Sequence, residues 1–159
     1  NPDTDGDGQN DLADADPVNA ASPIVAGGNA ATYHLGEVLV ENNVDPATKQ
    51  AAPDHLEIQV INDGDADLKS LTVYYTITDA DSKAVESYIY HPGIVVPASG
   101  DARIHVDGSG KAGHVRANPN SIYVISMSGK HVSVDVQADG FAAVQGTVEK
   151  DPGGPETAD

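Results

Sequence analysis

The chain has 159 residues, no cysteine and a formal charge of −17, from 25 acidic and 8 basic side chains. This length suits one domain, and the charge disfavours both sequence-independent nucleic-acid binding and adsorption to anionic membranes. The negative charge therefore predicts no nucleic-acid partner. No apolar run approaches the roughly 18 residues of a transmembrane helix, so we also expect no membrane insertion. Val and Ile account for 27 of the 34 Leu, Ile, Val and Phe residues, which favours strands over helices.

Residues 1–17 form an acidic, glycine-containing segment with the spacing of an EF-hand-type loop. Oxygen-bearing side chains alternate along it, and Gly8 stands at the sixth position, where a sharp backbone turn is needed. The closing position holds Asp14, one methylene shorter than the usual Glu. The expected Ca²⁺ ligands are Asp3, Asp5, Asp7, Gln9 through its backbone carbonyl, Asp11 and Asp14. The alternative is an acidic leader without a bound ion.

The flanking residues sharpen this interpretation. The run from Asn1 to Gly8, followed by Asp14-Ala15-Asp16-Pro17, resembles one thrombospondin type 3 calcium repeat. The resemblance implies Ca²⁺ as the cofactor, a structural rather than a sensing role, and an exported protein. A first residue of Asn rather than Met agrees with processing, so we expect a secreted, extracellular or cell-surface location.

The rest of the chain divides into a connecting segment, a body and a tail. Residues 18–54 connect, with one expected strand at 33–40. Residues 55–150 repeat short β-branched runs separated by turn clusters, and residues 151–159 are a tail or linker. Alternation of apolar and polar side chains predicts further strands at 56–60, 71–78, 85–90, 103–106, 122–126, 132–137 and 143–148.

Short, half-buried, turn-linked strands of this kind indicate an all-β fold, an antiparallel β-sandwich that follows the N-terminal calcium-binding loop. The expected core includes Val73, Tyr75, Ile77, Val132, Val134 and Val136. The run from Leu56 to Tyr75 resembles bacterial immunoglobulin-like surface and adhesion domains. A jelly roll is the alternative architecture.

Two weaker candidate sites lie within the body. Asp63, Asp65 and Asp67 occupy alternate positions of one loop and form a candidate second metal site, the alternative being a solvated hairpin loop. Candidate ligand-binding residues are Tyr74, Tyr88 and Tyr90, which would stack sugar rings if they formed an outward stripe. The alternative for these tyrosines is cross-strand pairing within the sheet.

Catalytic patterns are lacking in the sequence. The six histidines show no metal-binding spacing, although His114 and Arg116 could line a polar pocket, and no Gly-flanked serine indicates a nucleophile elbow. We therefore expect a non-catalytic, calcium-binding structural or adhesive module of a surface protein or extracellular assembly. Its expected partners are copies of itself or other cell-surface proteins. The alternative is a carbohydrate-binding accessory module of a secreted polysaccharide-degrading enzyme.

Overall fold

The computed structural model describes most of the body of the chain. The described residues are Thr4, Ile24, 27–40, 48–50, 56–107, 111–115, 117–118 and 120–153. The six residues expected to bind Ca²⁺, from Asp3 to Asp14, lie outside them.

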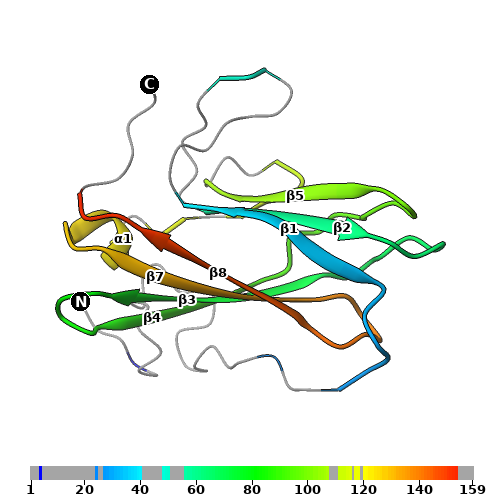
Figure 1. Ribbon diagram of the computed structural model, residues 1–159, viewed down its shortest axis with the longest axis horizontal. Coiled ribbons are helices and arrows are strands. Elements are labelled where there is room, and N and C mark those ends of the chain that lie inside the picture. The colour runs from blue at the N-terminus through cyan, green and yellow to red at the C-terminus, as the bar shows by residue number, and fades with distance from the viewer. Residues whose placement is uncertain are drawn as a thin grey trace.

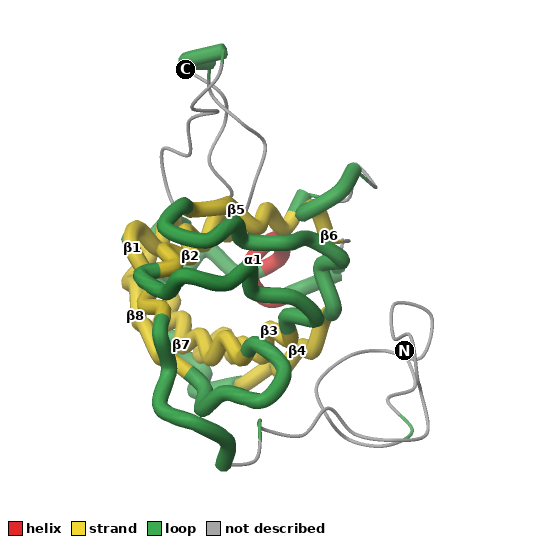
Figure 2. Tube along the Cα trace, turned by 90° about the vertical axis from the view of Figure 1, so that its right-hand side faces the viewer, coloured by secondary structure: helices red, strands yellow, loops and turns green. Residues whose placement is uncertain are grey.

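Two four-stranded sheets pack face to face, as expected for a β-sandwich (Figures 1 and 2). The first sheet has the order β1 (Tyr33–Leu39), β2 (Leu56–Asn62), β5 (Asp101–Val106) and β6 (His114–Val115). The second has the order β4 (Val85–Tyr90), β3 (Thr72–Asp79), β7 (Lys130–Gln137) and β8 (Val144–Lys150). Neighbouring strands are antiparallel except for β5 and the two-residue β6, which are parallel.

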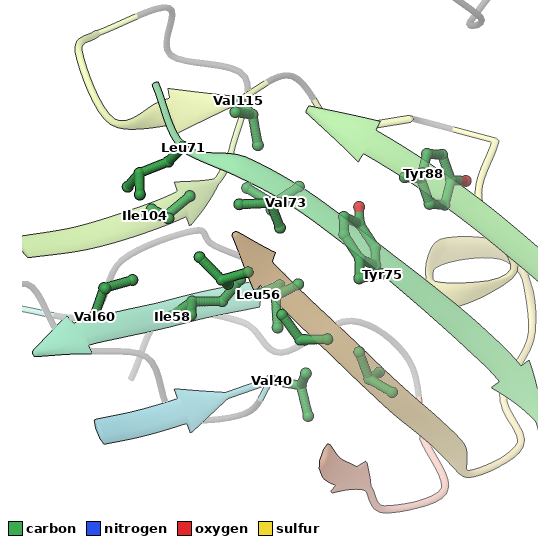
Figure 3. Close-up of a cluster of buried hydrophobic side chains, with 14 of the residues drawn as sticks. Val40, Leu56, Ile58, Val60, Leu71, Val73, Tyr75, Tyr88, Ile104 and Val115 are labelled. Atoms are coloured by element: carbon green, nitrogen blue, oxygen red, sulfur yellow. The ribbon is translucent and has the colours of Figure 1, made fainter. Parts of the chain in front are cut away.

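The core between the sheets follows the predicted alternation. Val73, Tyr75 and Ile77 of β3 are at most 2% exposed, and so are Val132, Val134 and Val136 of β7. The opposing layer comes from inward residues of the first sheet, among them Leu56, Ile58, Val60 and Ile104 (Figure 3). Because side chains alternate across a strand, this shared core fixes which residues of each strand face outward.

The strand expected at 122–126 is wrong, because the structure has one helical turn there, α1 (Ile122–Ile125). Ser121 caps this turn by accepting a hydrogen bond from the Tyr123 amide. The Tyr123 hydroxyl donates to the Val40 carbonyl at 2.7 Å, which ties the turn to the end of the first sheet. Such a short apolar run has no decisive periodicity, so tertiary contacts select its conformation.

The expected strand at 33–40 is present as β1, and it belongs to the sandwich rather than to a separate connection. It pairs with β2, with an irregularity between Leu35 and Val38. It also lies beside β8 of the second sheet, so that β1 and β8 close one side of the sandwich (Figure 2). No helix among the described residues is long and apolar enough to cross a membrane.

Candidate functional site

The acidic loop between β2 and β3 directs its carboxylates to different neighbours. Asp63 Oδ2 lies 2.6 Å from His34 Nδ1 of β1, whereas Asp67 Oδ1 accepts a hydrogen bond from the Ala98 amide at 3.0 Å. Asp65 is exposed between them. In the part of the chain that the structure describes, no three His, Asp or Glu side chains converge as metal ligands. The loop side chains thus contact neighbouring segments, and a second metal site on this loop stays a prediction.

The three candidate tyrosines lie on opposite faces of the second sheet. Tyr88 is 1% exposed and pairs across the strands with Tyr75, whose ring stacks on it at 5.0 Å between centroids. Tyr90 extends this inward stack, whereas Tyr74 lies on the outer face, where its hydroxyl donates to Ser87 Oγ. Tyr74, Tyr88 and Tyr90 thus do not form one outward stripe, and the aromatic pairing is cross-strand.

A buried hydrogen-bond network links the inner face of β4 to α1. Glu86 Oε2 accepts from the hydroxyls of Tyr88 and Ser121 at 2.7 and 2.8 Å, and Oε1 accepts from the Ile122 amide at 2.9 Å. Asn118 donates to the Tyr88 hydroxyl. Burial, followed by the neighbouring Glu86 charge, raises the pKa of Tyr88 well above its usual value. The Glu86 carboxylate, which accepts the hydrogen bonds from Ser121 and Ile122, holds α1 against β4.

The outer face of the first sheet carries a second acidic group that sequence reasoning did not single out. Glu57 of β2 is fully buried although it points away from the core, and it forms an ion pair with Arg103 of β5. Arg103 also contacts Glu37 of β1 at 2.7 Å, so its guanidinium bridges two carboxylates on neighbouring strands. Burial alone would lower the pKa of Arg103, but its hydrogen bonds to Glu37 and Glu57 outweigh this effect and raise it.

Two histidines extend this cluster along the sheet. His105 Nδ1 lies 3.7 Å from Glu57 Oε2, a buried oxygen for which the described residues supply no hydrogen bond. The His105 ring stacks on His114 of β6 at 4.6 Å between centroids, and His114 Nδ1 lies 2.6 Å from Asp107 Oδ2. The cluster thus alternates acidic and basic groups across the four strands of the first sheet, which is the arrangement that stabilises a sheet through cross-strand pairs.

The polar cluster at the end of β3 also has a structural geometry. The Asp79 carboxylate accepts hydrogen bonds from the hydroxyls of Ser126 and Ser128 and from the Ser82 amide. These bonds, led by the two hydroxyls, hold the pKa of Asp79 far below its usual value. The buried Lys130 ammonium lies 3.3 Å from Asp79 Oδ2. The group therefore anchors the β3–β4 turn to the segment before β7.

A shallow groove lies at one end of the second sheet. Its volume is about 490 Å³, and its lining includes Thr72, His91, Gln137 and Asp139. Thr72 Oγ1 and His91 Nδ1 are 3.3 Å apart, and Gln137 donates to the Phe141 carbonyl at 2.8 Å. Side chains of this kind suit hydroxyl-rich ligands, which need both hydrogen-bond donors and acceptors.

The fold defines the class of this protein as an all-β sandwich. No protein-family model matches the chain, and no curated protein shows significant similarity to it. Among solved structures it has a distant likeness, at a TM-score of 0.39 and 13% identity, to beta-glucuronidase 2 of Bacteroides uniformis covalently bound to cyclophellitol-6-carboxylate aziridine. The match covers 77% of this chain and 13% of that one.

Proposed function

We propose that the chain is a non-catalytic, calcium-binding structural or adhesive module of a secreted or cell-surface protein. The supporting observation is the alternation of Asp3, Asp5, Asp7 and Asp11 around Gly8, which matches the ligand spacing of a Ca²⁺ loop. An ion bound there would neutralise part of the −17 charge and stiffen the segment that precedes the sandwich in the sequence.

The use of the buried acidic groups agrees with a structural role. Catalytic carboxylates need a reacting group within hydrogen-bond reach and a pKa near the working pH. Asp79 and Glu86 instead have their oxygens engaged by donors from the chain itself. Glu57 is closed off by its own burial and by Arg103.

The order of the strands supports an immunoglobulin-like arrangement. The first, second and fifth strands form one sheet, and the third, seventh and eighth lie together in the other. Immunoglobulin constant domains likewise separate the first, second and fifth strands from the third and the last two, although here the fourth strand pairs with the third and the two-residue β6 is additional. This arrangement accords with the surface and adhesion domains that the sequence resembles.

Calcium titration calorimetry tests this proposal. The full chain should bind at least one Ca²⁺ in preference to Mg²⁺, because several carboxylates in a loop suit the larger ion. The double substitution Asp5→Ala with Asp7→Ala should abolish this binding. As a matched control, Asp81→Ala with Asp101→Ala removes the same charge from two exposed positions outside both candidate metal sites and should leave it intact. Unchanged binding after the first pair of substitutions would refute the calcium assignment.

The second candidate function, carbohydrate binding, is favoured by the groove at the end of the second sheet. Its lining combines hydroxyl, imidazole, amide and carboxylate groups, which together can donate and accept the hydrogen bonds of a sugar. Pull-down on insoluble polysaccharides separates this function from the first. Retention that is lost in Gln137→Ala and His91→Ala would favour it, whereas no retention on any polysaccharide would exclude it for the substrates tested.

A further inference from the structure

We propose that two copies of this chain associate by antiparallel pairing of their β4 strands, centred on Ser87. This inference deepens the adhesive role proposed above by naming a second copy as the partner, and it rests on that role. Three features carry it: the edge position of β4, the uncharged part of the face beside it, and a residue pattern that is complementary to itself.

The first feature is that no strand among the described residues pairs with the outer edge of β4. Of the four sheet edges, β1 and β8 lie beside each other and β6 has only two residues. The six residues of β4 pair with β3 in continuous register, without the irregularity seen in β1. Natural sheets protect exposed edges with Lys, Pro, bulges or inward-pointing charges. Of these β4 has only the inward Glu86, which is buried and accepts hydrogen bonds from Ser121 and Ile122. The nearby Lys83 directs its ammonium to the Ala80 carbonyl within the turn.

The backbone of β4 presents alternate groups to this edge. The Asp79 amide donates to the Ala84 carbonyl at 2.9 Å, which identifies 79 and 84 as a hydrogen-bonded pair. Because such pairs alternate along an antiparallel ladder, residues 86, 88 and 90 turn their amides and carbonyls toward β3. Val85, Ser87 and Ile89 turn theirs toward the free edge.

The second feature is that the part of the outer face formed by β3 and β4 carries no charge, although Asp135 and His131 of β7 lie beside β3 on that face. The outward side chains of β3 and β4 are hydroxyl-bearing or apolar: Thr72, Tyr74, Thr76, Thr78, Val85, Ser87 and Ile89. Val85 and Ile89 are 52% and 41% exposed. Two copies that each carry a charge of −17 repel each other at most contacts. At this part of the face no formal charges are brought into opposition, which favours a second copy as the occupant.

The third feature is the pattern of β4 itself. In a symmetric antiparallel pair centred on Ser87, Val85 of one copy lies opposite Ile89 of the other, and Ser87 lies opposite Ser87. The edge-directed backbone groups of all three have no partner among the described residues, so one register satisfies the hydrogen bonds and the apolar contacts together. The two second sheets then become one continuous eight-stranded sheet.

Sedimentation velocity of the full chain in EDTA tests this pairing apart from calcium binding. We expect a concentration-dependent dimer that strengthens on going from physiological salt to about 1 M NaCl, where the Debye length falls to about 3 Å and the repulsion is screened. Calcium binding is measured separately, so failure of the dimer and failure of the calcium loop are distinct results.

Charge substitutions at the centre of the pair give the decisive comparison. Ser87→Glu and Ser87→Lys should each weaken the dimer about fivefold, the factor that corresponds to about 1 kcal/mol for like charges directly opposed. An equimolar mixture of the two variants should dimerise at least as tightly as the wild type. Thr147→Glu and Thr147→Lys, on the outer face of β8 in the same sheet, are the matched controls and should change nothing.

Three results would overturn the proposal: a wild-type chain that stays monomeric in high salt, Thr147 variants that behave like Ser87 variants, or a mixture no tighter than its components. Circular dichroism checks that each variant is folded. If a charge at Ser87 disturbs the hydrogen bond from Tyr74 and unfolds the domain, Val85→Lys mixed with Ile89→Glu tests the same register.

Discussion

Removing one partner of the Glu57–Arg103 ion pair should lower the free energy of unfolding far more than replacing both partners with uncharged side chains. Glu57 is fully buried on the outer face of the first sheet, and the Arg103 side chain is 19% exposed. Removing one partner of a buried pair leaves an uncompensated charge and costs about 3–5 kcal/mol. Because Arg103 retains some access to water, we expect the lower end, about 3 kcal/mol, for Arg103→Met. Methionine keeps the packing of the long side chain without its charge.

The double variant Arg103→Met with Glu57→Gln separates the charge effect from packing. With the buried charge also removed, most of the lost stability should return, since replacing both partners of a buried pair is often neutral. Urea unfolding followed by far-ultraviolet circular dichroism gives the free energies. For a chain of this length, about 3 kcal/mol corresponds to a fall in Tm of about 6–12 °C.

An outcome in which the two substitutions add would refute this reasoning. Additive losses would mean that Glu57 does not depend on Arg103 for compensation and that each side chain acts through packing alone. Glu37→Gln is the comparison variant, because Glu37 contacts the same guanidinium but is 59% exposed. An exposed partner contributes about 0–1 kcal/mol.

Two further predictions concern the core and the acid sensitivity of the fold. Val134→Asp, at a fully buried position, should unfold the domain, because an unpaired buried charge costs several kcal/mol of a free energy of unfolding near 5–15 kcal/mol. Ser133→Asp, on the outer face, should leave the urea midpoint nearly unchanged. Asp79, whose pKa is lowered in the folded state, stabilises the fold above the unfolded pKa of about 3.9, and this contribution is lost as pH falls below it. The stability difference between the wild type and Asp79→Asn should therefore be largest near neutral pH and shrink below about pH 4; a difference independent of pH would contradict this.

The sequence by itself determined the fold class and the inward residues of most strands. Alternation in β3 and β7 places Val73, Tyr75, Val132 and Val134 in the core, where the structure has them. This works because one face of each strand must be buried, so a shift of one residue would expose the whole apolar set. The β-branched composition and the turn residues between the runs support the same conclusion.

Only the tertiary structure decided what covers each outward or polar side chain. Glu57 alternates outward and reads as a solvated residue, yet Arg103 from a strand more than forty positions away compensates its buried charge. Residues 122–126 have the composition of a strand, but contacts with Glu86 and Val40 hold them in a helical turn. The pairing of β3 with β4 places Tyr88 opposite Tyr75 on the inner face of the sheet, whereas Tyr74 lies on the outer face. Pairing between distant strands sets these environments, and local periodicity carries no information about which strands will be neighbours.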